Sequence, residues 1–167
     1  MSGGPLMVLL TWNPGRVNDR RWTPTQWYAE MVTPHARGET VTTSWGVGRH
    51  VNGFAVGRPV VLYRQGAWGR GLVARGVLAS EPRPDPERTR NIVDVEWGES
   101  VPIDDALEVA ELERAAPSFP WRQVWSSGRH LPEDVTSAVL RAWAERLEDV
   151  RRGSAGECGM RSAGCAP

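Results

Sequence analysis

Two tryptophans stand where an apolar run gives way to a short glycine-rich turn. Trp12 ends the run at residues 6–12 and precedes Asn-Pro-Gly, and Trp45 precedes Gly-Val-Gly-Arg at 46–49. An indole at such a boundary can line a pocket, and its flat ring suits stacking on a nucleobase. Glycines at 46 and 48 would let the backbone approach a ligand closely. The alternative is that both rings pack in the core.

Polar side chains near these rings could read the edge of a base. The amide of Asn13 can donate and accept, as the edge of cytosine requires, or it could make a local turn bond. Tyr63 could close an aromatic cage or pack in the core, and the two serines after Trp125 could bind a base or merely start a turn. The predicted base-binding residues are therefore Trp12, Asn13, Ser44, Trp45, Gly46, Tyr63, Trp125, Ser126 and Ser127.

Arginine carries every fixed positive charge, because the sequence contains no lysine. Residues 1–80 hold nine arginines and three acids, whereas residues 91–167 hold eight arginines and fourteen acids. Guanidinium groups bind phosphates bidentately, so a basic amino-terminal half is typical of nucleic-acid binding. The predicted phosphate-binding residues are Arg49, Arg64 and Arg70. For Arg64 and Arg70, a place in a solvated rim is the alternative.

Catalytic and metal-binding patterns are not found in the sequence. The three histidines are far apart, and HNH, HExxH and P-loop patterns are missing. Cys158 and Cys165 have no histidine nearby, so they do not form a zinc site. No apolar window approaches the roughly 18 residues of a membrane span. We therefore expect a cytoplasmic protein that is not an enzyme and has no cofactor or membrane partner.

Apolar runs and turn residues predict alternating strands and helices. The expected strands are 6–12, 41–45, 59–64, 71–80 and 92–97, and the expected helices are 26–32, 104–115 and 132–150. Thr23 followed by proline predicts the cap of the first helix, and Trp97, Trp121 and Trp143 are expected in the core. The pattern predicts one α+β domain at 1–150, a curved mixed sheet or small β-barrel flanked by helices. The tail at 151–167 is expected to be disordered.

The order of short motifs resembles the EVE domain of the PUA-like superfamily, which is related to YTH and ASCH domains. The segments that carry the resemblance are 9–14 (Leu-Leu-Thr-Trp-Asn-Pro), 44–49, 56–66, 71–77 and 125–128 (Trp-Ser-Ser-Gly). Arg58 stands where the family usually has an acid after the glycine at 57. The likeness is greatest to the EVE domains that accompany HNH nucleases in bacterial modification-dependent restriction proteins.

This resemblance implies a reader with a PUA-like fold, whose cavity receives one flipped base. EVE relatives are associated with modified cytosine in DNA, and YTH relatives read a methylated adenine in RNA. The predicted function is DNA binding with base flipping and caging of a modified base, first of all 5-methylcytosine. Two alternatives stay open, namely an RNA-binding module for a modified base and an accessory subunit of a restriction system with a nuclease partner.

Overall fold

The computed structural model describes residues 6–15, 22–49 and 51–161, with side chains described to residue 156. Within these ranges eight strands form one curved sheet in the order β2-β6-β4-β3-β1-β8, and β5 pairs with β6 and β7 with β4. β1 and β3 are parallel, and β1 is antiparallel to β8. The strands are β1 (Met7–Trp12), β2 (Val41–Gly48), β3 (Pro59–Arg64), β4 (Gly71–Leu78), β5 (Arg83–Pro84), β6 (Asn91–Ser100), β7 (Leu107–Glu108) and β8 (Arg129–Leu131).

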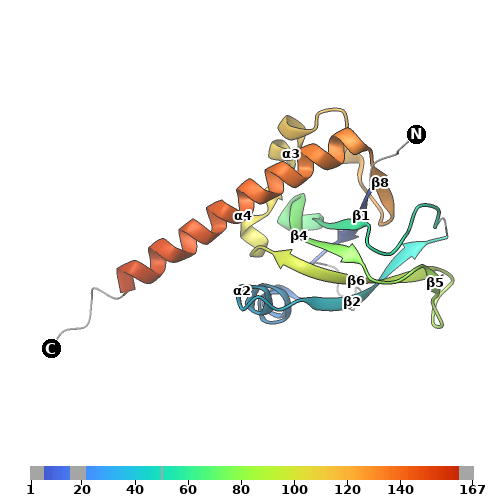
Figure 1. Ribbon diagram of the computed structural model, residues 1–167, viewed down its shortest axis with the longest axis horizontal. Coiled ribbons are helices and arrows are strands. Elements are labelled where there is room, and N and C mark those ends of the chain that lie inside the picture. Colours follow the sequence, from blue (N-terminus) through green and yellow to red (C-terminus); the bar gives the residue numbers. More distant parts are fainter. Residues whose placement is uncertain (1–5, 16–21, 50, 162–167) are drawn as a thin grey trace.

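Helices lie on both sides of the sheet (Figure 1). On one side α1 (Pro24–Trp27), the π-helical η1 (Tyr28–Val32) and α2 (Thr33–Ala36) follow one another without a break. On the other side lie α3 (Val109–Ala115) and α4 (Glu133–Arg161), whose carboxyl-terminal part extends past the sheet (Figure 1). Single 3₁₀ turns are η2 (Gly66–Trp68), η3 (Ile103–Asp105) and η4 (Trp121–Gln123). No helix in the described part of the chain could span a membrane.

The first helix begins where the sequence predicts. The Thr23 hydroxyl accepts from the backbone N–H of Gln26 at 3.2 Å, and the Gln26 side chain accepts from the backbone N–H of Thr23 at 2.9 Å. This reciprocal capping satisfies two backbone donors that the first turn leaves unpaired. Pro24 occupies the first helical position, where its missing N–H costs nothing. The expected cap is thus confirmed.

The sheet separates two apolar cores. Side chains alternate between the faces of a strand, so Val8, Leu10 and Trp12 of β1 pack with the α1–η1 segment, in the core that contains Trp27 and Met31. Met7 and Leu9 point the other way and join the core beneath α3 and α4. Trp97, Trp121 and Trp143 are buried, as predicted. Burial on both faces explains why β1 and β3 read as continuous apolar runs.

The predicted α+β class and curved mixed sheet are confirmed, and the sheet is open rather than closed into a barrel, with β2 and β8 at its ends. Several elements differ from prediction: the first helical segment continues to Ala36, β2 continues to Gly48, and β5, β7 and β8 lie where no strand was expected. The helix expected at 104–115 begins at Val109, because Leu107–Glu108 pairs with β4 and the Glu108 side chain then caps the helix. The tail expected to be disordered from residue 151 continues α4 as far as Arg161.

Candidate nucleic-acid interface

The loop before β8, at one end of the curved sheet, packs against β2, at the other end. The indole N–H of Trp45 in β2 donates to the hydroxyl of Ser127 over 3.2 Å. The same hydroxyl accepts from the backbone N–H of Thr11 in β1 over 2.9 Å. A Cβ on Gly128 would lie 3.0 Å from the carbonyl oxygen of Val47, so the loop before β8 packs directly on β2. We call this junction the seam.

A cavity of about 490 Å³ opens at the seam. The residues that line it come from the end of β2 and the residue after it, the loop before β6, and the loop before β8 with the first residue of β8. They are Gly46, Val47, Gly48, Arg49, Arg90, Ser126, Ser127, Gly128 and Arg129. Of these nine, three are arginines and none carries a carboxylate. Small-molecule pockets typically measure roughly 300–1,000 Å³, so this cavity, the seam slot, has room for one nucleobase.

Arg90 forms one wall of the seam slot because residue 46 is glycine. A Cβ on Gly46 would lie 2.4 Å from Nη1 of Arg90, so the guanidinium packs on the bare backbone. Nε of Arg90 donates to Oδ2 of Asp85 over 2.9 Å. The backbone N–H of Glu87 and then Arg90 hold the pKa of Asp85 below its ordinary value. Asp85 is therefore ionised at neutral pH and fixes the guanidinium at the slot.

Trp12 and Trp45 are buried behind the seam slot rather than open to it, with exposures of 1% and 2%. Trp12 stacks on Trp27 with ring centroids 4.7 Å apart. Trp22 lies 5.7 Å from Trp12 and 5.8 Å from Trp45, and so covers both rings. The prediction that Trp12 and Trp45 line an open pocket for a base is therefore wrong, because Trp22 packs against both rings. The indoles of Trp12, Trp22, Trp27 and Trp45 form one buried cluster. This cluster contacts the slot lining through the hydrogen bond from Trp45 to Ser127.

Ser44 and Asn13 make their contacts within the protein, away from the described slot lining. Strand alternation puts Ser44 on the face of β2 opposite Trp45, and its hydroxyl donates to Asp94 over 2.7 Å. Arg83 and then Ser44 lower the pKa of the Asp94 carboxyl. Oδ1 of Asn13 accepts from the backbone N–H two residues on, at 3.0 Å. Asn13 thus makes the local turn bond that was the alternative to reading a base.

Tyr63 and Arg64 are buried parts of the scaffold. Tyr63 lies in the core beneath α4, on the other side of the sheet from Trp12, and its hydroxyl donates to the carbonyl of Trp121 over 2.7 Å. Burial raises the pKa of this hydroxyl. Arg64 is 2% exposed, and its Nη2 lies 2.8 Å from Glu108. A guanidinium so enclosed does not face solvent, so the structure gives Arg64 no access to a phosphate.

The structure does bring several predicted residues together, namely Gly46, Arg49, Ser126 and Ser127 at the seam slot. Arg49 is exposed, and no acid among the described residues pairs with it. Trp125 and Arg70 lie on the neighbouring surface, with the Arg70 guanidinium 4.4 Å from the Trp125 ring centroid. Their roles in binding stay predictions.

Sequence reasoning missed Arg90 and Arg129 in the slot lining and Trp22 in the indole cluster. Arg90 ends a charged, proline-rich stretch that reads only as an exposed loop. One signal was available, because an acid five residues before Arg90 could pair with it, as Asp85 does. Nothing local marks Trp22, whose ring contacts come from tertiary packing.

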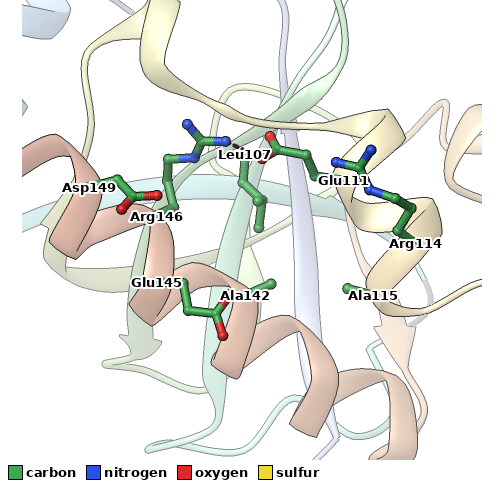
Figure 2. A pocket seen from close by; sticks show the side chains of 8 residues that line it. All are labelled: Leu107, Glu111, Arg114, Ala115, Ala142, Glu145, Arg146 and Asp149. Atoms are coloured by element: carbon green, nitrogen blue, oxygen red, sulfur yellow. Dashed lines mark hydrogen bonds and ion pairs between the residues drawn. The ribbon is translucent and has the colours of Figure 1, made fainter.

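Three other cavities lined by described residues lie elsewhere and carry a different charge. Figure 2 shows the one between α3 and α4, of about 320 Å³, where Arg146 pairs with Glu111. Two arginines and three acids line it. The cavity over β4 and β6 has one arginine and two acids, and the cavity beside His35 has one of each. Among the described residues, no group of three or more His, Cys, Asp and Glu side chains could hold a metal ion.

Solved structures share this arrangement of strands and helices. The human THYN1 protein in complex with 5-methylcytosine containing DNA matches with a TM-score of 0.56 and 17% identity, over 81% of this chain and 96% of that one. The DUF55 domain of human thymocyte nuclear protein 1 matches with a TM-score of 0.51 and 16% identity, over 81% and 96%. The chain has the DUF55 fold. A hypothetical protein from Leishmania major matches with a TM-score of 0.59 and 16% identity, over 86% and 98%.

The DUF55 fold is shared at low sequence identity. Comparison of the sequence with protein-family models and with curated proteins gives no match. The human and Leishmania matches, at 16–17% identity, therefore establish the fold and leave the chemistry of the site to be argued from this chain's own residues.

Proposed function

We propose that the chain is a non-enzymatic DNA-binding reader that receives one extruded modified cytosine, first of all 5-methylcytosine, in the seam slot. The observation that carries this is the charge of the slot. Of the four cavities described, it has three arginines and no carboxylate, whereas each of the others contains at least one acid. An anionic strand is therefore drawn to this cavity in preference to the other three.

The lining supplies the groups that a nucleotide needs. Exposed Arg49 and the fixed guanidinium of Arg90 can contact phosphates on either side of an extruded base. The hydroxyls of Ser126 and Ser127 and the backbone around Gly46 present donors and acceptors for a base edge. The solved human THYN1 complex with 5-methylcytosine containing DNA shares the fold and lends this assignment support.

Magnitudes limit how strongly a methyl group can be read. Extrusion of a base costs a few kcal/mol, which charge-assisted phosphate contacts can offset. One buried methyl contributes about 0.8 kcal/mol, a factor of about four in affinity. The proposal therefore implies a modest preference for the methylated site together with strong dependence on salt.

Fluorescence anisotropy with three duplexes, identical except for cytosine, 5-methylcytosine or 5-hydroxymethylcytosine at one position, tests the proposal. We expect the methylated duplex to bind about fourfold more tightly than the unmodified one. Arg90→Gln should weaken binding to every duplex by about fivefold or more. The matched control is Arg152→Gln on the extended part of α4, where the side chain is 73% exposed. Equal binding of all three duplexes, with Arg90→Gln no weaker than its control, would discard the proposal.

An RNA target and a nuclease partner stay predictions from the EVE resemblance. To test for an RNA target, RNA that carries the same modified base is made to compete with the methylated duplex for binding. Stronger competition by the RNA than by the DNA would favour the RNA target. Recovery of a nuclease with the full chain under native conditions tests the second.

A further inference from the structure

A serine and a histidine form a hydrogen-bonded pair at the carboxyl end of β6. The hydroxyl of Ser100 and Nδ1 of His35 in α2 lie 2.6 Å apart. Nε2 of the same imidazole lies 3.0 Å from the backbone carbonyl of Trp97. Because a carbonyl oxygen can only accept, Nε2 carries the ring proton and donates it, which leaves Nδ1 to accept from the serine hydroxyl.

A serine in this arrangement is an activated nucleophile. A serine hydroxyl is a weak nucleophile unless a neighbouring base takes its proton, and the base works best when a third group orients it. Here His35 is the base, and the carbonyl of Trp97 fixes its orientation. Burial lowers the pKa of the imidazole below its ordinary 6.5, although the bond to Trp97 and the charge of Glu99 act in the opposite direction. The ring is therefore neutral at neutral pH and can take a proton.

The pair lies in the wall of a cavity between α2, the end of β6 and α4. This cavity measures about 550 Å³ and is the largest of the four described. His35 and Ser100 are both only partly buried, so a molecule in the cavity can reach them. The apolar side chains of the lining are Val32, Ala36, Pro102, Leu147 and Val150. A volume and lining of this kind suit a small, largely apolar molecule.

One cation stands at the same cavity. The guanidinium of Arg151 on α4 lines it and is exposed, and no acid among the described residues pairs with it. A positive charge here can stabilise the negative charge that develops on a carbonyl oxygen when a nucleophile attacks its carbon. The one acid of the lining, Glu99, accepts from the indole N–H of Trp143 over 2.7 Å.

We propose that Ser100 takes the acyl group of a small activated ester held in this cavity. The bond between Oγ of Ser100 and the acyl carbon forms, and the bond between that carbon and the leaving oxygen breaks. The Oγ proton passes to Nδ1 of His35 and from there to the leaving oxygen. One acyl group is transferred to each chain, so this is a site of covalent modification, and DNA reading stays non-enzymatic.

The inference goes beyond the proposed function and does not rest on it. Arg90 of the seam slot directly precedes β6, and Ser100 is the last residue of that strand. Ten residues of extended strand span about 30 Å. The two sites are therefore separate, and each can be tested without the other.

The test is reaction of the full chain with p-nitrophenyl butyrate, after which peptide mass spectrometry locates the butyryl group. We expect the group on Ser100. Ser154 is the matched comparison in the same chain, because it lines the same cavity but its hydroxyl donates to the carbonyl of Val150 over 3.1 Å rather than to a histidine. It should stay unlabelled. The sequence contains no lysine, so no lysine amine competes for the ester.

His35→Gln tests the base, because glutamine can form hydrogen bonds but cannot take the proton. The rate of Ser100 labelling should fall by about 100-fold or more. In the unaltered chain the rate should fall as the pH falls below 6.5 and the imidazole becomes protonated. A bond that only held α2 on β6 would give neither result.

Thermal melting checks that His35→Gln is folded, and the comparison of the two serines uses the unaltered chain and does not depend on the variant. Equal labelling of Ser100 and Ser154, no label on Ser100, or an unchanged rate in folded His35→Gln overturns the proposal. These outcomes leave the reader untouched, since DNA binding is measured separately with the three duplexes.

Discussion

The indole N–H of Trp45 donates to the hydroxyl of Ser127 over 3.2 Å, and this bond ties the free end of the sheet to the loop before β8. Ser127 also accepts from Thr11 on β1 over 2.9 Å. One hydroxyl thus joins β2, at one end of the open sheet, to β1, the strand next to its other end, and the seam slot lies beside it. Ser127 therefore contributes both to the stability of the fold and to the lining of the seam slot.

Ser127→Ala should lower the free energy of unfolding by about 1–3 kcal/mol, because it removes the hydroxyl that accepts from the indole N–H of Trp45 and the backbone N–H of Thr11. Urea unfolding followed by tryptophan fluorescence measures it. The neighbouring Ser126→Ala is the control, since Ser126 is exposed, and it should change stability by less than about 0.5 kcal/mol. Equal effects of the two substitutions would show that the bond contributes nothing to closing the seam.

Gly46→Ala should reduce DNA binding while leaving the fold intact. The new methyl would lie 2.4 Å from Nη1 of Arg90, so the guanidinium must leave the slot wall, which its flexible side chain permits. We expect a loss of about fivefold in duplex affinity with little change in thermal midpoint. Gly98→Ala is the matched control, because no atom lies within 4 Å of a Cβ built there. If Gly46→Ala binds the duplex as tightly as the unaltered chain, Arg90 does not contact the DNA.

Arg49→Gln should reduce the dependence of binding on salt. Each phosphate contact adds about one unit to the slope of log affinity against log salt concentration, so removal of one contact should lower that slope by about 1. Anisotropy titrations at several salt concentrations supply the slope. Arg152→Gln, whose side chain is 73% exposed on α4, should leave it unchanged. The same slope in both variants would argue against a phosphate at Arg49.

His35 should make the fold sensitive to acid. Its Nε2 lies 3.0 Å from the carbonyl of Trp97, which can only accept, so Nε2 carries the proton and Nδ1 accepts from the Ser100 hydroxyl at 2.6 Å. Burial lowers the pKa of this imidazole below its ordinary 6.5. The unfolded chain therefore binds more protons below pH ~6.5, and stability should fall as the pH falls through that value.

Thermal melts of the unaltered chain and of His35→Gln between about pH 7.5 and 5 measure this effect. The thermal midpoint of the unaltered chain should fall more steeply toward low pH than that of the variant. The other two histidines are present in both proteins, so their contributions cancel. Parallel curves would contradict the assignment of the neutral tautomer.

Local sequence signals predicted the elements that local chemistry builds. Thr23 and Pro24 start the first helix because capping involves neighbours along the chain. The apolar runs that became β1 and β3 are buried on both faces, as such runs indicate. The helix expected from residue 104 failed at its start because Leu107 pairs with Leu72 of β4, a contact between distant segments.

The site was harder to predict because it depends on strand register and on which rings meet. Thr11 pairs with Tyr63, which puts Tyr63 and Trp12 on opposite faces and excludes a cage built from both. The sequence alone does not reveal this register. Gly46 and Arg49 were found from their own turn, whereas Arg90 reaches them from a loop more than forty residues away.

Backbone amide chemical-shift mapping by nuclear magnetic resonance tests the central claim most directly. Methylated and unmodified duplexes of one sequence are titrated into the full chain. We expect the largest shifts, and the largest differences between the two duplexes, to fall on residues 46–49 and 126–129. Shifts confined to the cavity between α3 and α4, or identical shifts with both duplexes, would contradict a methylcytosine reader at the seam.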